Sequence, residues 1–467
     1  MSTMTTITTM PRERRPTIMK TVDDIPLDRL AYFCMLCLGI GSLLPWNAFI
    51  TAVDYYQHFY PQYHPDRVIP VLYMTINVIV TGLLVKFGSA VSINRKILSG
   101  FAGYAVAMFG VPVCDKLLFP TGADDMHGEG NMAAMVITLS FVAVIAVANG
   151  FVQGSLFGMC GPLPLVYTGA AVIGTAISGV FISVLRIGTK IAFGDSPDGL
   201  SKGIYVYFAS GGLFSLFCIY LHQKVVPDLP IMRWHHAVTR VNEKSKKGEQ
   251  SPLLGDGGAS KVADNDMWSL VIASSMERLK REGTSNGQKR GSFDLEAPGS
   301  SHGQDEVKLI PVFKRLWTYA MAVFFAYLVT LSIFPGVLAE NLKSPTLKSW
   351  YSLFLITVFN VGDMTGKMCP PKFQVKDGGL LFCFSIMRLA FVPIYAIFVQ
   401  EGMSDVAFFV VTSCLGLTNG YLTTCAMSTA PTLFRPQESE VAGTMMVFFL
   451  LFGLSTGAMA GWLWVFL

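Results

Sequence analysis

The chain has 467 residues, of which 52% are hydrophobic and 14% charged, and its mean hydropathy is +0.49. Such a composition excludes an ordinary soluble globular protein of this length, so most of the chain is expected to lie in lipid. The net charge of +4 is small and dispersed without a dense basic stripe, and we therefore predict no nucleic-acid partner.

Residues 1–29 carry several Arg and Lys but lack the apolar stretch of a cleavable signal peptide. We predict that they form a cytosolic N-terminal segment, because positively charged flanks stay on the cytosolic side of a first span. Most later loops agree with this orientation, although Arg186, Lys190 and Lys202 near one external connection run against it.

Apolar windows of about 20 residues recur along the rest of the chain, each long enough as a helix to cross a hydrocarbon core about 30 Å thick. Backbone polar groups in lipid need internal partners, so these windows predict helices, whereas a membrane barrel would show short alternating segments. We expect about eleven spans, at 30–50, 68–87, 96–118, 132–157, 163–187, 203–226, 309–336, 349–369, 378–399, 404–429 and 440–466. The predicted fold is an all-α polytopic membrane protein with six spans, a break and five spans.

The break is a polar segment over residues 227–308, rich in Ser, Gly and charges of both signs. This composition is typical of a flexible, solvated linker, so we predict a cytosolic loop between a six-helix bundle over 30–226 and a five-helix bundle over 309–467. Within the loop, EQSPLL has the acidic dileucine form that sorting adaptors read, which makes Glu249, Leu253 and Leu254 candidates for an adaptor contact. A tether without a partner is the alternative.

The first span carries a polar and aromatic face. Leu43, Trp46, Asn47 and Ile50 follow the spacing i, i+3, i+4, i+7 and share one side of a helix that also contains Pro45. Polar side chains inside a membrane cost free energy, so they are site candidates, and an aromatic plane beside an amide suits a planar, hydrogen-bonding ligand. The alternative is an interfacial Trp beside an Asn that satisfies backbone groups freed by the proline.

Amides lie one turn apart in the fourth span, at Asn149 and Gln153. Each amide both donates and accepts hydrogen bonds, as recognition of a base edge or a ribose hydroxyl requires. A hydrogen bond between helices is an equal alternative.

The eighth span holds a polar row of Asn360, Asp363 and Lys367. Two opposite charges four residues apart are tolerated inside a membrane only when they are paired or face water. The pair is predicted to serve a substrate or a gate, with a structural ion pair as the alternative.

Glycines at four-residue spacing predict close helix packing, and Asn419 between two of them is interpreted as part of that packing. The rows are Gly150, Gly154 and Gly158; Gly416 and Gly420; Gly453, Gly457 and Gly461. No catalytic cluster, metal-ligand spacing or phosphate-binding loop is present in the sequence, so we expect no enzyme activity, no cofactor and no metal.

Six motifs in chain order closely resemble the equilibrative nucleoside transporter family. They are LLPWNAFITA at 43–52, QGSLFG at 153–158, FP at 334–335, FNxxD at 359–363, RLxFxP at 388–393 and LxNGYL at 417–422. The resemblance runs from about residue 30 to the C-terminus outside the long loop, and VDYY at 53–56 is most similar to the plant branch. It implies a fold similar to the major facilitator type, an extracellular C-terminus, and alternating-access transport of nucleosides such as adenosine and uridine, with nucleobases left open.

The resemblance also implies roles for residues within the bundles. Leu43, Trp46 and Asn47 would line a central cavity in which Gln153 hydrogen-bonds the nucleoside. Asp363 and Lys367 would hold the ribose, joined by Asn360 of the same row, while Leu454 lies opposite in the last span. The family's human prototype has Arg at the position of Lys367, and a Lys offers a point charge in place of a planar fork.

Gate and coupling residues follow from the same motifs. Ile50, Phe334 and Pro335 look like the external gate. Transport is either facilitative or proton-coupled, and Asp54 and Asp363 are the candidate proton sites. A transporter of organic cations or monoamines is the alternative function, and the home membrane is predicted to be the plasma membrane, with the vacuolar membrane as the alternative.

Overall fold

The structure, a computed structural model, describes residues 28–87, 91–118, 129–160, 163–233, 309–370, 373–402, 404–434 and 436–466. Within these ranges every regular element is helical. The predicted adaptor contact at Glu249, Leu253 and Leu254, nearly all of the predicted loop, and residues 1–27 lie outside the described residues.

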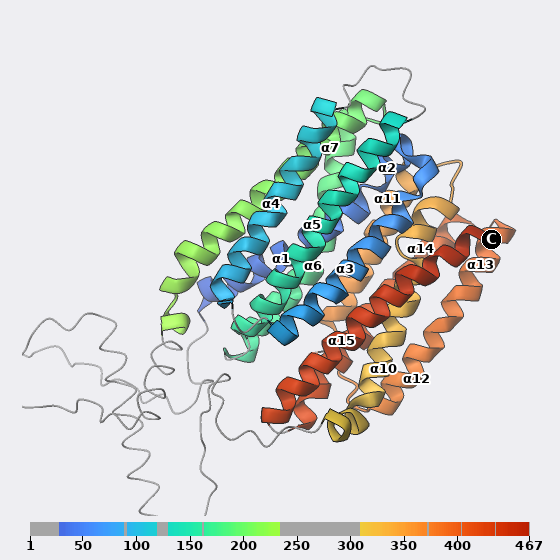
Figure 1. Ribbon diagram of the computed structural model, residues 1–467. Helices are drawn as coiled ribbons and strands as arrows, with labels where there is room; N and C mark the ends of the chain where they lie inside the picture. Colours follow the sequence, from blue (N-terminus) through green and yellow to red (C-terminus); the bar gives the residue numbers. More distant parts are fainter. Residues whose placement is uncertain are drawn as a thin grey trace, which may run out of the picture. The chain divides into compact units, whose positions relative to one another are not determined.

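The first helix set precedes the undescribed loop. It comprises α1 (Arg29–Thr51), α2 (Val53–Phe59), α3 (Pro65–Phe87), α4 (Ile93–Leu118), α5 (Glu129–Cys160), α6 (Leu165–Phe193) and α7 (Pro197–Tyr220), which continues through the short turns η4 (Leu221–Val225) and η5 (Val226–Asp228). Within the set α1 packs along α6, α4 along α5 and α7, and α3 along α5 (Figure 1).

The second helix set follows the loop. It comprises α10 (Leu309–Ile333), η6 (Val337–Asn341), α11 (Trp350–Met368), α12 (Gly378–Met387), η7 (Arg388–Ala390), α13 (Phe391–Glu401), α14 (Asp405–Thr429), α15 (Pro436–Ala460) and η9 (Gly461–Phe466). Here α11 packs along α14, and α10 packs along α15 and α12. The elements α12, η7 and α13 together form one interrupted span.

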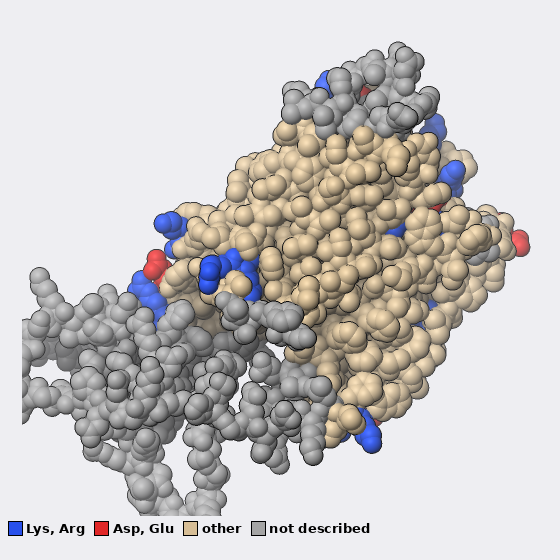
Figure 2. Space-filling view, in the orientation of Figure 1, with Lys and Arg blue, Asp and Glu red and all other residues tan. Residues whose placement is uncertain are grey.

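Ten of the described helical segments are long and apolar enough to cross a membrane. The predicted span at 349–369 forms α11 but is not among those ten, and it is the helix that carries Asn360, Asp363 and Lys367. The face of the molecule in Figure 2 is largely uncharged across its middle, as contact with lipid tails requires. Within the described residues, six of these ten segments precede the loop and four follow it, with α11 as a further long helix of the second set. These helices confirm the predicted fold class, an all-α polytopic membrane protein.

Local sequence explains several helix boundaries. The hydroxyl of Ser196 accepts a hydrogen bond from the Gly199 amide at 3.1 Å just before α7, which begins with Pro197. Asp377 caps α12 in the same way, accepting from the Leu380 amide at 2.8 Å. Such caps satisfy amides that have no partner within the helix.

The two sets meet along α6 and α11 and along α3 and α15 (Figure 1). Successive spanning helices run in opposite directions, so α1, α6 and α10 end where α3, α7 and α11 begin. We call this the Thr51 end of the bundle and the opposite end, where α1 begins, the Arg29 end.

Glycines allow α11 and α14 to touch at their backbones. A Cβ atom at Gly420 would lie 2.1 Å from the carbonyl oxygen of Asp363, and one at Gly366 would lie 2.2 Å from that of Leu417. The close-packing prediction is therefore correct for this row. It is wrong for Gly154 and Gly158, where an added Cβ would meet no atom of the described residues within 4 Å.

Candidate functional site

A polar network around Asp363 lies inside the second helix set. Its carboxylate forms an ion pair with Lys367 Nζ at 2.6 Å and accepts a hydrogen bond from Asn419 Nδ2 at 2.7 Å. The Asp363 and Lys367 side chains are 13% and 16% exposed. Each charge therefore has a partner, and both side chains keep some accessible surface for a ligand.

Arg388 extends this network from η7, and the prediction of site residues missed it. The guanidinium is buried, with Nη1 at 3.3 Å from Asn419 Oδ1 and Nη2 donating to Thr330 Oγ1 at 2.8 Å. It also donates to the carbonyls of Ala326 and Leu415, both at 3.1 Å. A single Arg in the middle of the apolar run 378–400 was the signal that could have revealed it.

Asn419 bridges the carboxylate of Asp363 and the guanidinium of Arg388. Its amide nitrogen donates to Asp363, while its oxygen accepts from Arg388 and, at 2.9 Å, from Thr330 Oγ1. The interpretation of Asn419 as a packing residue is incomplete, because the side chain is fully hydrogen-bonded and orients Asp363. We call Asp363, Lys367, Asn419, Thr330 and Arg388 the Asp363 network.

In the first helix set, Trp46 stacks on Tyr73 of α3. The two ring centroids are 4.3 Å apart and the planes differ by 25°. Both side chains are buried, so Tyr73 covers one face of the indole and fixes its orientation. Tyr73 was not predicted as a site residue, although it lies within the second predicted span.

Gln153 belongs to a chain of amides and hydroxyls. Asn149 Nδ2 donates to Gln153 Oε1 at 3.4 Å. The hydroxyl of Tyr104 on α4 lies within donating distance of two acceptors, Asn149 Oδ1 at 3.0 Å and the Ser42 carbonyl oxygen at 2.9 Å. Asn149 thus makes the hydrogen bond between helices that was the alternative for this pair. Among the residues that the structure describes, the amide nitrogen of the half-buried Gln153 donates no hydrogen bond, and a Cβ atom added to the adjacent Gly154 would meet no atom within 4 Å.

The asparagines at positions 47 and 360 both bind one segment of α6. Asn47 Nδ2 donates to Ser178 Oγ at 3.0 Å. Asn360 Nδ2 reaches across from α11 to the Gly179 carbonyl at 3.2 Å and to Ser183 Oγ at 3.0 Å. The structure therefore connects the polar faces of α1 and α11 through α6, while Leu43 on α1 and Leu454 on α15 are half-buried.

The residues predicted as a gate lie at the Thr51 end. Ile50 and Pro335 line the same small cavity. Phe334, which precedes Pro335 through a cis peptide bond, stacks on Phe359 with ring centroids 4.1 Å apart. Apolar side chains from both helix sets therefore meet here.

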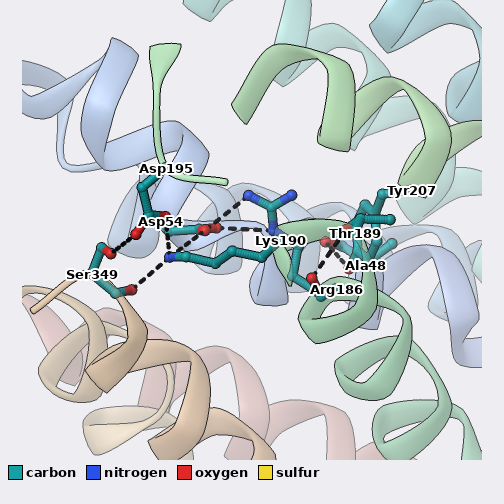
Figure 3. A network of polar contacts seen from close by, with 8 residues as sticks. All are labelled: Ala48, Asp54, Arg186, Thr189, Lys190, Asp195, Tyr207 and Ser349. Atoms are coloured by element: carbon teal, nitrogen blue, oxygen red, sulfur yellow. Dashed lines mark hydrogen bonds and ion pairs between the residues drawn. The ribbon is translucent and has the colours of Figure 1, made fainter. Parts of the chain in front are cut away.

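A charged cluster at the Thr51 end also joins the two sets (Figure 3). Asp54 forms ion pairs with Arg186 Nη2 at 2.8 Å and with Lys190 Nζ at 3.1 Å. Lys190 also donates to the carbonyl of Ser349 at 2.9 Å and pairs with Asp195 at 3.1 Å, and Ser349 Oγ donates to Asp195 at 2.7 Å. We call these five residues the Asp54 cluster.

The charges of the Asp54 cluster balance. Arg186 and Lys190 are buried and face two carboxylates, which explains why these cations ran against the expected charge bias of the loops. Partial burial alone would raise the pKa of Asp195, but hydrogen bonds from Ser349 and Lys190 outweigh it and lower that pKa.

A second group of contacts joins the sets through Arg67 of α3. Its Nε lies 2.7 Å from Glu340 Oε2, Nη2 donates to Asn341 Oδ1 at 2.7 Å, and Nη1 donates to the Gly461 carbonyl at 3.2 Å. His64 Nδ1 contacts the other oxygen of Glu340. We call His64, Arg67, Glu340 and Asn341 the Glu340 cluster, which the sequence analysis did not anticipate.

Comparison with known proteins gives a consistent result. Residues 139–466 match the family model described as nucleoside transporter. The chain is 33% identical over 442 residues to equilibrative nucleotide transporter 1 of Arabidopsis thaliana, covering 93% of this chain and 86% of the relative. It is 32% identical over 441 residues to equilibrative nucleotide transporter 8 of the same plant, covering 94% of this chain and 95% of the relative.

Among solved structures, the crystal structure of a D-xylose–proton symporter has a similar fold. The TM-score is 0.57 at 12% sequence identity, and the match covers 93% of this chain and 89% of that one.

Proposed function

The chain belongs to the equilibrative nucleoside transporter family and is similar to its plant members, and from this premise we propose that it carries nucleosides such as adenosine and uridine by alternating access. The organic cation alternative gains no support from the relatives, whose names are those of nucleotide transporters. Because the matched family and relatives are named as transporters, the absence of enzyme activity stays part of this proposal.

The observation that carries this proposal is the Asp363–Lys367 pair. A ribose presents neighbouring hydroxyls, each a donor and an acceptor, and the pair offers a carboxylate acceptor beside an ammonium donor at 2.6 Å. A phosphate would instead need free cations, whereas Lys367 and Arg388 are both engaged. These contacts favour nucleosides over nucleotides as cargo.

The first helix set supplies the proposed contacts to the base. Gln153, held by Asn149, would read a base edge with its free amide nitrogen. Trp46, fixed by Tyr73, would supply apolar surface, with Leu43 and Leu454 flanking the cavity. Asn47 and Asn360 act through α6 and hold the two sets in register around the site.

The Thr51 end is proposed to be the external gate, which follows from a cytosolic N-terminus. Ile50 and Pro335 line one small cavity there, and the Asp54 and Glu340 clusters join the two helix sets, contacts that a closed gate would make. Opening would separate the two helix sets there and break those contacts. We place the protein in the plasma membrane, with the vacuolar membrane as the alternative.

Proton coupling through Asp54 or Asp363 stays a prediction. Asp54 is bound to Arg186 and Lys190, and Asp363 to Lys367 and Asn419. A pH gradient imposed on proteoliposomes tests coupling directly, since uptake that ignores the gradient would exclude it.

Uptake of radiolabelled adenosine into proteoliposomes that contain the purified full chain tests the proposed function. We expect saturable uptake that unlabelled adenosine and uridine compete and that adenosine monophosphate and serotonin do not. Saturable serotonin-sensitive uptake would support the organic cation alternative, and uptake equal to that of empty liposomes would contradict transport of nucleosides.

A further inference from the structure

Asp66 is a buried acid next to the Glu340 cluster that the proposed mechanism does not use. Its side chain is 1% exposed and lines the cavity that also contains Ile50 and Pro335. Its Oδ2 atom has no hydrogen-bond partner among the described residues. A Cβ atom added to Gly336 would lie 3.5 Å from this oxygen, so Asp66 faces the second helix set.

Asp66 and Glu340 share one guanidinium. Arg67 Nε lies 2.7 Å from Glu340 Oε2 but 3.7 Å from Asp66 Oδ2, and the terminal nitrogens of Arg67 donate to Asn341 and Gly461. The two carboxyl groups also interact electrostatically with each other. The Asp66 side chain is 1% exposed, whereas that of Glu340 is 29% exposed. Two ionised carboxylates against one cation would leave an uncompensated negative charge beside the buried Asp66, which is unfavourable.

One additional proton balances this charge. Two carboxyls close together share a proton because both cannot ionise cheaply, and His64, in contact with Glu340, is a third group able to hold it. In such a coupled group the proton belongs to the set and not to one residue.

The other groups that face this site, among the residues that the structure describes, offer no competing charge. From η9 they are the Gly461 carbonyl and the Trp462 ring, whose centroid is 6.2 Å from that of His64. From α1 and α2 they are Phe49, Ile50 and Tyr56. The remaining titratable groups of α2 are Asp54, bound to Arg186 and Lys190, the buried Tyr55, and the exposed His58.

We propose that Asp66, Glu340 and His64 form a regulatory proton site that is completed when the Thr51 end closes. Separation of the helix sets takes Glu340 away from Asp66, so each carboxylate ionises in water and the proton leaves. Closure therefore takes up one proton and opening releases it to the same side. The proton tunes the gate without being transported.

The role of this site in regulating a gate rests on the proposed function, whereas the experiment that tests the site does not require transport. Spin labels at Lys202 and Lys343, attached in a cysteine-free background that retains uptake, report the separation of the two sets at the Thr51 end without any substrate. We expect the ratio of closed to open populations to rise as the pH falls from about 8 to 5, by up to about tenfold per pH unit where the site titrates.

Neutral substitutions separate this proposal from a structural role. Asp66→Asn removes the charge that needs the proton, so the variant is expected to stay closed and lose its pH response. Asp198→Asn, at an exposed residue, is the matched control and should keep the wild-type response. Glu340→Gln provides the same test from the second set if Asp66→Asn does not fold.

A wild-type distance distribution that does not change with pH would overturn the proposal, as would an unchanged pH response in both neutral variants. Adenosine uptake is measured on the same samples at about pH 7.5, a pH at which the proposed proton site is expected to be only partly protonated. Failure of uptake with a normal pH response would contradict the proposed function and leave the proton site supported.

Discussion

The Asp363 network and the two clusters at the Thr51 end use the same kinds of groups but connect different parts of the molecule. The Asp363 network joins α10, α11, α14 and η7 within the second helix set. The Asp54 and Glu340 clusters join one set to the other. A network inside one set keeps its geometry when the sets move, whereas contacts between sets must break. The first arrangement suits a substrate site, and the second suits a gate.

The largest effect is expected from neutralising Asp363. In Asp363→Asn the ammonium of Lys367 loses its charged partner inside the membrane, and the proposed ribose acceptor is lost with it. A buried unpaired charge costs about 3 kcal/mol or more, so adenosine uptake should fall about 100-fold or more at equal protein in the liposomes. Asp198→Asn serves as the control, and uptake within a factor of two of wild type in Asp363→Asn would separate Asp363 from the site.

A somewhat smaller loss is expected at Arg388, which acts as a positioning residue through Asn419. Arg388→Met removes the hydrogen bonds to Asn419, Thr330 and two carbonyls, so Asp363 loses its fixed orientation. We expect about a 10- to 100-fold fall in kcat/KM, with a lower melting temperature in detergent. If Arg388→Met lowers stability while the KM for adenosine is unchanged, the residue is structural alone.

Breaking the Asp54 cluster should change the gate and spare binding. Asp54→Asn weakens the attachment of Lys190 and Ser349, so the closed population at the Thr51 end should fall. We expect about a three- to tenfold change in the maximal uptake rate with little change in KM. A rise in KM without a change in spin-label distances would assign Asp54 to the substrate site.

The contacts of the Asp54 cluster should not change in mild acid, unlike those of the proposed proton site at Asp66. The lowered pKa of Asp195 means that its contribution to stability is fully present above the unfolded pKa of about 3.9 and is lost only as pH falls through the still lower folded pKa. Asp66→Asn transporters, which retain this cluster, should therefore show constant spin-label distances between about pH 5 and 8. A remaining pH response in that variant would point to a titrating group in the Asp54 cluster.

The smallest effect is expected when Lys367 is changed to Arg. The guanidinium can bind Asp363 and a ribose hydroxyl at once, so KM for adenosine should fall about two- to fivefold with little change in maximal rate. A large loss of uptake would show that the space beside Asp363 fits only an ammonium group.

Sequence periodicity predicted those features that involve residues of a single helix. The spans and the Asp363–Lys367 pair follow from hydropathy and from i, i+4 spacing, and both are present. Contacts between helices depend on crossing angles and register, which periodicity does not contain. For this reason the bridge from Asn419 to Arg388 and the contact of Arg67 with Glu340 were missed.

The outcome for glycines shows the same limit. Gly420 and Gly154 have the same four-residue spacing in their rows, yet one touches the backbone of α11 and the other meets open space. Spacing identifies a smooth helix face, but only the neighbouring helix decides whether that face is packed or lines an opening.

Equilibrium binding of radiolabelled adenosine to purified wild-type, Asp363→Asn and Asp54→Asn proteins tests the division between site and gate most directly. We predict that Asp54→Asn binds within about threefold of wild type and that Asp363→Asn binds at least about 30-fold more weakly. Equal losses in both variants, or full affinity in Asp363→Asn, would contradict the assignment of the Asp363 network to the substrate and of the Thr51 end to the gate.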